Sequence, residues 1–397
     1  MKVDIPARAP VVVIGGGPAG LLLARLLQLS GVESVVLERQ TRAHVMSRIR
    51  AGVLEWGTVE TLRAAEVGER MDREGSVHEG VGLSFRGRHL RIDFKALTGR
   101  SIMVYGQTQV TRDLYGALDA AGVTVVDEAA DVRLHDVDTD APYVTFRHRG
   151  TSHRIDCAYV AGCDGFHGVS RTTIPVSILR TYERLYPFGW LGILSETPPV
   201  DTELVYCHSD RGFALCSMRH AMLSRYYVQC AVDDDPGAWP DERFWDELRP
   251  RLPHDAAERL VTGPSIEKSI TPLRSFVAEP LRHGRLFLAG DAGHVVPPTG
   301  AKGLNLAVSD AFYLARALVE AHRAGNRRHL ETYSATALRR VWGAARLSWW
   351  LTSLLHRFPG EAAFEERMRT VEFDRLAATE HAQAALAEEY VGLPFDN

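Results

Sequence analysis

The sequence predicts an α/β fold in which a parallel-sheet domain carries an antiparallel-sheet domain and ends in a helical region. Three observations lead to this prediction. Residues 11–14 form a short, β-branched apolar run typical of a buried parallel strand, and a helical pattern at 18–29 and another strand at 34–37 follow it. From about 178 to 270 the chain contains mainly short strand-like segments. From about 303 onward it is mainly helical in pattern.

The bulk composition is that of an ordinary globular protein. The chain has 397 residues and a net charge of -4, which argues against a nucleic-acid-binding protein, since these are usually basic. The five cysteines include no C-x-x-C pair, so we expect buried free thiols in a reducing compartment. The N-terminus lacks the apolar core of a signal peptide, and no apolar run is long enough to span a membrane. We therefore expect a cytoplasmic protein.

A glycine pattern follows the first strand. Gly15, Gly17 and Gly20 have the G-x-G-x-x-G spacing of a Rossmann-like dinucleotide-binding turn, which needs a tight bend, close approach of the pyrophosphate and helix-on-strand packing. Glu38, at the end of the next strand, matches the acidic residue that holds a ribose hydroxyl, and it would repel a 2'-phosphate. An ordinary glycine-rich turn is the alternative. This motif alone does not distinguish NAD from FAD.

Two further strand ends carry candidate ligand-binding residues. The apolar strand 286–289 runs into Gly290-Asp291, and a Pro-Pro-Thr-Gly loop and the start of a helix follow at 297–305. Such a loop delivers backbone amides and a helix N-terminus to an electron-rich group, which in a flavoenzyme is the pyrimidine edge of the flavin. Alone, it could be an ordinary strand–loop–helix connection. Cys163-Asp164-Gly165, taken alone, predicts only a turn.

Together, these stretches resemble the FAD-dependent aromatic hydroxylases, and the resemblance extends along nearly the whole chain. It is carried by the strings RIRAGVLE, VHEG, VYGQTQVTRDL, AGCDGFHG, YPFGWLG, GFALCSMR, SRYYVQ, RLFLAGDAGH, PPTGAKGLNLA, LHRFP and EYVGLP. The resemblance implies hydroxylation of 4-hydroxybenzoate to 3,4-dihydroxybenzoate with NAD(P)H and O2, through a flavin C4a-hydroperoxide, in a homodimer. A sister hydroxylase acting on another hydroxy- or aminobenzoate is one alternative, and a dinucleotide-binding protein without catalysis is another.

The change of pattern along the chain predicts a division into domains. We expect residues 1–177 to form the first part of a discontinuous FAD-binding domain and residues 178–270 to form the substrate-binding domain. Residues 271–397 are expected to return to the FAD-binding domain and to end in a helical interface region.

The resemblance places the substrate carboxylate on Arg219 and Ser217, with Tyr227 contributing. A guanidinium can hold a carboxylate through parallel charge-assisted hydrogen bonds, and residues 215, 217 and 219 share one face of a strand. A surface arginine at a strand end is the alternative interpretation of Arg219.

The resemblance further assigns Tyr206, Tyr390 and His78 to the path of the phenol proton. Ring attack needs an electron-rich ring, two tyrosine hydroxyls in series can relay a proton, and histidine titrates in the suitable range. From the residues alone, each would more often be structural. Pro298, through its carbonyl, and Thr299 are expected beside the substrate.

The remaining expectations concern the cofactors. The FAD-binding residues implied by the resemblance are Gly15, Gly17, Ala19, Gly20, Glu38, Arg48, Arg50, Gln107, Asp291, Leu304 and Asn305, and Arg225 is expected to influence whether the flavin ring lies inside or swings outward. Nicotinamide cofactor binding is expected from Arg39, Gln40, His44, His167, Arg171 and Arg274. Arg39, Arg42 and His44 favour NADPH, with NADH as the alternative. No metal is expected.

Overall fold

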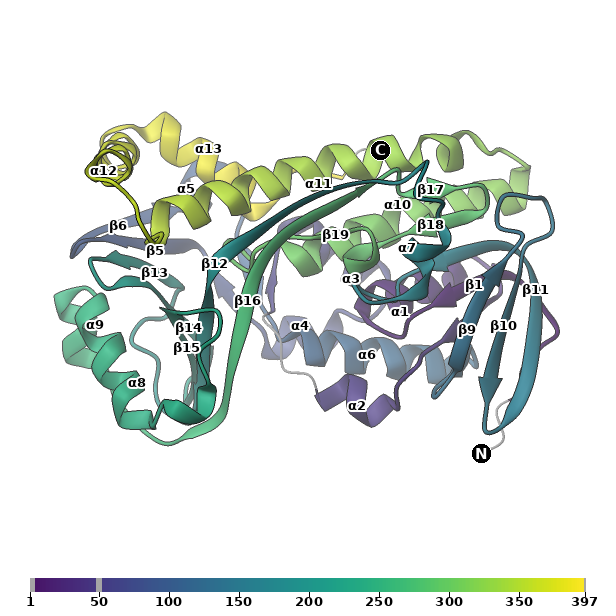
Figure 1. The fold of residues 1–397 in the computed structure, drawn as a ribbon, viewed down its shortest axis with the longest axis horizontal. Coiled ribbons are helices and arrows are strands. Elements are labelled where there is room, and N and C mark those ends of the chain that lie inside the picture. Colours follow the sequence, from purple (N-terminus) through teal and green to yellow (C-terminus); the bar gives the residue numbers. More distant parts are fainter. Residues whose placement is uncertain (1–3, 48–51, 396–397) are drawn as a thin grey trace.

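In this computed structural model, which describes residues 4–47 and 52–395, the strands form two large sheets and a small one (Figure 1). The mixed α/β architecture confirms the predicted fold class. The five cysteines are buried and free, as expected.

The N-terminal sheet is built around the predicted β-α-β unit. Strand β1 pairs in parallel with β2 on one side and with β11 on the other, and β11 and β2 pair in parallel with β18 and β8 respectively. The strands of this sheet are β1 (Arg8–Ile14), β2 (Ser34–Leu37), β8 (Thr124–Val126), β9 (Ala130–His135), β10 (Tyr143–His148), β11 (Thr151–Gly162), β17 (Arg282–His283) and β18 (Leu286–Leu288). Apolar residues of α1 (Pro18–Leu29), α6 (Gln107–Ala120) and α10 (Lys302–Ala324) share its core. The carboxyl ends of its parallel strands therefore meet at one edge, where ligands bind in such sheets.

The second sheet is mainly antiparallel. Its strands, in spatial order, are β19 (His294–Val295), β16 (Ser265–Glu279), β12 (Arg180–Ser195), β15 (Leu223–Cys230), β14 (Gly212–His220), β13 (Val205–Ser209), β5 (Gly80–Phe85) and β6 (Arg88–Asp93). The two longest strands, β12 and β16, form a curved ribbon that begins near the N-terminal sheet and ends near α8 (Figure 1). The short helices α8 (Asp241–Leu248) and α9 (His254–Arg259) lie over the end of this sheet.

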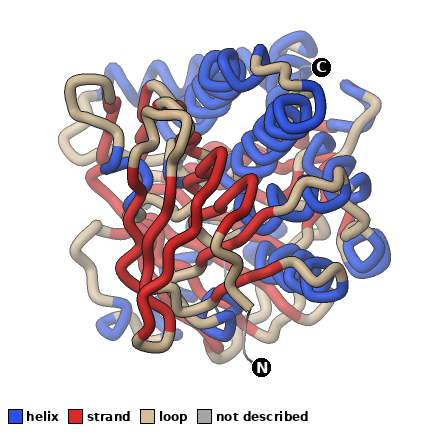
Figure 2. The backbone as a smooth tube through the Cα atoms, turned by 90° about the vertical axis from the view of Figure 1, so that its right-hand side faces the viewer, coloured by secondary structure: helices blue, strands red, loops and turns tan. Residues whose placement is uncertain are grey.

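The remaining elements complete the core between the sheets. The small sheet consists of β3 (Val53–Leu54), β7 (Ile102–Val104) and β4 (Ser76–His78). The shorter helices are α2 (Arg42–Ser47), α3 (Trp56–Ala64), α4 (Glu69–Glu74), α5 (Phe94–Thr98) and α7 (Val169–Thr173), and the C-terminal helices are α11 (Arg328–Leu355), α12 (Ala363–Ala378) and α13 (Glu380–Val391). Figure 2 shows the strands gathered together with helices along the adjoining sides. Within the described ranges, no helix is both long enough and apolar enough to cross a membrane.

Local differences from the expected elements have simple causes. The hairpin expected near residues 81–94 is present as β5 and β6, and β5 pairs in parallel with β13 of the second sheet. The helix expected at 53–65 begins only at Trp56, because Val53 and Leu54 pair with β7 as a strand. The helix expected near 242–252 ends at Leu248 and continues as a 3-10 turn that contains Pro250, a residue that cannot continue an α-helix without strain.

Candidate active site

The glycine turn between β1 and α1 has the geometry of a pyrophosphate site. Gly15 has a φ of 111°, and a Cβ there would lie 2.3 Å from the carbonyl oxygen of Cys163. A Cβ on Gly20 would lie 2.1 Å from the carbonyl oxygen of Gly15, so both positions require glycine. A Cβ on Gly17 would meet nothing within 4 Å. Gly17 therefore leaves open space at the N-terminus of α1, where backbone amides can face a phosphate.

Glu38 lies beside this turn. Its Oε2 accepts a hydrogen bond from the Gly16 amide at 2.7 Å, and its Oε1 accepts one from the Gln40 amide at 2.7 Å. Each carboxylate oxygen keeps a second lone pair, so ribose hydroxyls can still donate to it. Glu38 thus fixes the main chain on both sides of the position that a ribose would occupy.

The Gly290–Ala292 turn packs against the same helix. A Cβ on Gly290 would lie 3.3 Å from the Cβ atoms of both Ala19 and Ala307, and Gly290 has a φ of 61°. The half-buried Asp291 lies on this turn, which brings it to the edge of the sheet where Gly17 lies. Three predicted FAD-binding positions, Ala19, Gly17 and Asp291, are therefore neighbours on adjoining elements.

Sequence reasoning missed the residue that holds this turn in place. Asp310, on α10, accepts hydrogen bonds at one carboxylate oxygen from the Gly290 amide at 2.8 Å and from Nε2 of His294 at 2.6 Å. Both side chains are buried; burial opposes the charge of His294, but the Asp310 carboxylate raises its pKa above the usual value. The one signal in the sequence is an aspartate within an apolar helical segment (NLAVSDAFYLA).

The start of α10 forms the next side of the site. The Asn305 side chain is fully engaged with the main chain: it accepts from the Glu55 amide at 2.9 Å and donates to the carbonyls of Val53 at 2.9 Å and Ala301 at 2.8 Å. Its contribution to a cofactor would therefore come from its backbone. Leu304 is partly buried beside it.

Gln107, another of the predicted cofactor ligands, is partly buried at the start of α6. Arg48 and Arg50 lie outside the described residues. Open space at Gly17, the Glu38 carboxylate, the Asp291 turn and the N-terminus of α10 together fit the pyrophosphate, ribose and ring of FAD.

One face of the second sheet gathers the predicted substrate residues. Tyr206, Leu215 and Tyr227 lie directly opposite one another on β13, β14 and β15, so their side chains share a face. Ser217 lies opposite Arg225 two positions further along, on the same face. Gly192 on β12 leaves room for them, because a Cβ there would lie 2.6 Å from the Tyr227 ring and 3.2 Å from the Arg225 guanidinium.

The two arginines of this face differ in their partners. Arg225 is buried and forms an ion pair with Glu267 on β16. Arg219 has no carboxylate within ion-pair distance among the described residues, and its Nε atom has no hydrogen-bond partner there. Burial lowers the pKa of Arg219, an effect that the nearby Tyr227 opposes and the Arg225 charge reinforces. Arg219 is therefore the guanidinium available for an anionic ligand.

A pair of tyrosines lies at the other end of this face. The hydroxyls of Tyr206 and Tyr390 are 2.8 Å apart, and both side chains are buried. Burial raises the pKa of Tyr206 to about 12 and that of Tyr390 well above its usual value. His78 is fully buried, its pKa is lowered by burial, and neither ring nitrogen has a partner in the described part of the chain.

The Pro-Pro-Thr-Gly loop reaches this tyrosine pair. The main chain of Gly300, which has a φ of 88°, lies close enough to the Tyr206 hydroxyl to lower the pKa of Tyr206, against the larger raising effect of burial. The Pro298 carbonyl accepts from the Ala301 amide at 2.9 Å and retains a lone pair, while the Thr299 hydroxyl accepts from Thr352 at 2.9 Å. The loop thus connects the tyrosine pair to the start of α10.

The residues predicted for the nicotinamide cofactor fall into two groups. His167, Arg171 and Arg274 gather around Phe166: the two guanidinium carbons lie 4.6 and 4.4 Å from its ring centroid, and the His167 ring meets it edge-on at 5.0 Å. Arg171 also donates to the Ala292 carbonyl at 3.0 Å, which ties this group to the Asp291 turn. The Cys163-Asp164-Gly165 turn supports it, since Asp164 accepts from the amide of Ser170 on α7 at 2.9 Å.

Arg39, Gln40 and His44 form the other group, between β2 and α2, with Arg39 and His44 exposed. Arg42, in the same segment, is not free: its guanidinium binds both carboxylate oxygens of Asp119 at 2.5 and 3.0 Å and lies over the Tyr115 ring. Arg42 is therefore not available to bind a 2'-phosphate.

Similarity to known proteins agrees with this geometry. A family model described as "FAD binding domain" matches residues 8–348. The p-hydroxybenzoate hydroxylase of Acinetobacter baylyi is 50% identical over 390 residues, which cover 98% of this chain and 96% of that protein. This chain belongs to the FAD-dependent aromatic hydroxylase family.

More distant members of the family share its architecture. The para-nitrophenol 4-monooxygenase of a Pseudomonas species is 28% identical over 82% of this chain and 81% of its own. The crystal structure of p-nitrophenol 4-monooxygenase from Pseudomonas putida superposes with a TM-score of 0.81 over 98% of this chain and 99% of that one, at 19% identity. At such identity the likeness establishes the fold alone.

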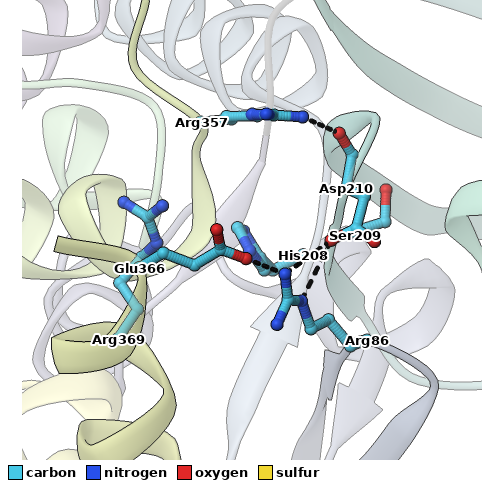
Figure 3. Close-up of a pocket in the computed structure, with 7 residues that line it drawn as sticks. All are labelled: Arg86, His208, Ser209, Asp210, Arg357, Glu366 and Arg369. Atoms are coloured by element: carbon cyan, nitrogen blue, oxygen red, sulfur yellow. Dashed lines mark hydrogen bonds and ion pairs between the residues drawn. The ribbon is translucent and has the colours of Figure 1, made fainter. Parts of the chain in front are cut away.

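This protein also has a pocket that lies outside the candidate site. It has a volume of about 260 Å³ and is lined by Arg86, His208, Ser209, Asp210, Arg357, Glu366 and Arg369 (Figure 3). Two of its three arginines are already paired with carboxylates, Arg86 with Asp210 and Glu366 and Arg369 with Glu361, and Arg357 donates to the Asp210 carbonyl. None of the predicted site residues lines it.

Proposed function

We propose that this protein is a flavoprotein monooxygenase that converts 4-hydroxybenzoate to 3,4-dihydroxybenzoate with NAD(P)H and O2. The observation that carries the proposal is the arrangement of polar groups on one sheet face. The Arg219 guanidinium, which has no carboxylate partner among the described residues, lies towards one end, and the Tyr206–Tyr390 pair lies towards the other. A ligand with a carboxylate on one side of its ring and a hydroxyl on the other matches this arrangement. The name of the Acinetobacter relative supports the same substrate.

In this proposal, different residues bind the substrate and transfer its phenol proton. Arg219 and Ser217, with Tyr227, bind the carboxylate, and the phenol hydroxyl lies against Tyr206 and the Pro298 carbonyl, with Thr299 behind the loop. Tyr206 takes the phenol proton as Tyr390 receives the proton that Tyr206 releases, and His78 passes it on. FAD, when bound, supplies the activation of oxygen. Because removal of the proton makes the ring electron-rich, these groups control how readily the ring is attacked.

We further propose NADPH as the reductant, with NADH as the alternative. Exposed Arg39 and His44, together with Arg171, can meet an anionic cofactor, whereas Arg42 is paired with Asp119 and Arg274 with Glu183. Arg225 is proposed to influence the position of the flavin ring.

Rapid-mixing reduction of the bound flavin tests the proposal. NADPH and NADH are each mixed with the FAD-loaded protein, with and without 4-hydroxybenzoate, and products are identified across hydroxy- and aminobenzoates. We expect 4-hydroxybenzoate to stimulate reduction and to yield 3,4-dihydroxybenzoate. A preparation that makes no such product, but hydroxylates another benzoate, would identify the sister enzyme instead.

The homodimer is proposed from an exposed apolar face. Helix α12 exposes 69% of Phe364 and 44% of Met368, α11 exposes 43% of Trp349, and β12 exposes 63% of Leu185. A groove of about 560 Å³ runs between α11 and α12 and includes Phe364 and Met368 in its lining. Exposed large apolar side chains beside a groove are typical of subunit interfaces.

Oligomeric state provides the test of this face. We expect the wild-type protein to sediment as a dimer and Phe364→Glu to sediment as a monomer, because a charge in an apolar interface must be desolvated without a partner. Val176→Glu, at a residue that is 94% exposed outside this face, is the control. A Phe364→Glu variant that remains fully dimeric would contradict the assignment.

A further inference from the structure

Two arginines and one carboxylate form a compact charged cluster on the ligand-facing side of the second sheet. Arg225 and Glu267 lie on either side of Leu194 in one cross-strand row. Both terminal nitrogens of Arg225 donate to the Glu267 carboxylate, one of them at 3.2 Å. Ser269 donates to the same carboxylate at 3.0 Å, so Glu267 is held in place from its own strand as well.

Arg219 completes the cluster without a carboxylate of its own. The charges of Arg225 and Glu267 both affect its pKa, the first lowering and the second raising it, in addition to the larger lowering by burial. With two guanidinium groups and one carboxylate ionised, this face carries a net charge of one positive unit. One ligand carboxylate on Arg219 brings that charge to zero.

We propose that Glu267 is a specificity-determining residue that restricts this pocket to aromatic acids with a single carboxylate. The inference rests on the proposed function. A second ligand carboxylate would find Arg225 already paired and would be repelled by Glu267. Rejection through an unfavourable charge is an effective route to specificity, because a partly buried anion without a counter-charge is costly. Without Glu267, Arg225 would become a second site for an anion.

Ligand binding to Glu267→Gln tests this directly. The FAD-loaded protein is titrated calorimetrically with 4-hydroxybenzoate and with 4-hydroxybenzene-1,2-dicarboxylate, which carries one additional carboxylate next to the first. We expect the affinity for the diacid, relative to the monoacid, to rise at least about tenfold in the variant at low salt, and the gain to shrink as salt screens it. Glu267→Asp keeps the charge and should preserve the wild-type preference.

Glu247→Gln is the matched control. Glu247 pairs with Arg251 much as Glu267 pairs with Arg225: both arginine side chains are 5% exposed, and the carboxylates are 24% and 28% exposed. Helix α8 carries Glu247, and it packs on the opposite face of the sheet. Loss of this carboxylate should lower stability without changing the preference between the two acids.

The outcomes separate the two proposals. Wild-type binding of 4-hydroxybenzoate with an unchanged diacid preference in Glu267→Gln would overturn this inference alone. A wild-type protein that binds no 4-hydroxybenzoate would overturn the proposed function and this inference with it. Should Glu267→Gln not fold, the wild-type protein still decides: a diacid that binds as tightly as the monoacid, with a steeper salt dependence, would show that Glu267 does not exclude it.

Discussion

At the scale of single residues, the Tyr206 hydroxyl is the group on which the proposed chemistry most depends. Tyr206→Phe keeps the buried ring but removes the oxygen that lies 2.8 Å from the Tyr390 hydroxyl. We expect binding of 4-hydroxybenzoate to change by only a few fold, since Arg219 is intact, and hydroxylation to fall by about 10²-fold or more. Ultraviolet spectra of the bound ligand, recorded against pH, should show that the variant no longer favours the phenolate.

Tyr226→Phe provides the comparison for this prediction. Tyr226 precedes Tyr227 on β15, is as deeply buried as Tyr206, and faces the opposite side of the sheet. Its hydroxyl has no hydrogen-bond partner in the described part of the chain. Equal hydroxylation by Tyr206→Phe and Tyr226→Phe would contradict the proton path.

Residues that act through local spacing could be predicted from the sequence, whereas those that act through distant contacts could not. The spacing of Gly15, Gly17 and Gly20 along the sequence predicts a tight turn with room for a pyrophosphate. In contrast, Lys302 is buried against Glu55, 2.6 Å from its carboxylate and 247 positions away in the chain. The sequence around Lys302 does not indicate Glu55 as its partner, and the sequence around Glu55 does not indicate Lys302. Arg42 shows the same limit, because its partner Asp119 lies on another helix.

At the scale of secondary-structure elements, the turn Gly290–Ala292 depends on Asp310 of helix α10. Asp310→Leu leaves the Gly290 amide and the His294 ring without their acceptor, and each lost partner costs about 1–3 kcal/mol. We expect FAD affinity to fall at least about tenfold, measured by fluorescence titration of the apoprotein. Asp310→Asn, whose amide oxygen can still accept both hydrogen bonds, should lose much less.

The comparison with a surface ion pair makes this prediction specific. Asp140→Leu removes the carboxylate that pairs with Arg285 at an exposed site and should leave FAD affinity unchanged. If Asp310→Leu unfolds at lower temperature yet binds FAD as the wild type does, the aspartate supports the core without positioning the turn.

The order and type of elements were largely predictable, and their exact ends were less so. The first β-α-β unit is set by apolar periodicity and a Pro18 start, both local properties. Strand β3 was missed because its pairing with β7 joins residues about 50 positions apart. The membership of β5 and β6 in the second sheet likewise depends on a long-range parallel pairing, with β13.

At the scale of the whole molecule, two buried histidines should make stability depend on pH. His356 is enclosed between the rings of Phe188 and Phe213 and accepts a hydrogen bond from Trp190 at 2.7 Å. Burial lowers its pKa to about 3 and that of His208 to about 4. In the unfolded chain both would titrate near 6.5.

The direction of this pH dependence follows from the difference in proton binding between the folded and unfolded chains. Below about pH 6.5 the two histidines bind protons in the unfolded chain but not in the folded chain, so the free energy of unfolding falls as pH drops toward 4 and then 3. The loss is at most roughly 5 kcal/mol for His356 and roughly 3 kcal/mol for His208. Urea unfolding at several pH values measures this. His356→Gln, whose amide can make the same hydrogen bonds, should show a shallower decline between pH 6.5 and 4, and an identical decline would contradict the assignment.

The paired strands β12 and β16 connect the segment between them to the rest of the chain. The chain leaves the N-terminal sheet along one of these strands and returns along the other, and the two are hydrogen-bonded neighbours from Arg180–Glu279 to Ser195–Ser265. The segment between them is therefore joined to the rest of the chain through two adjacent antiparallel strands, so that the chain enters and leaves it side by side. A graft that replaces this segment would have to preserve the pairing of β12 with β16, the parallel pairing of β13 with β5, and the contact of Tyr206 with Tyr390.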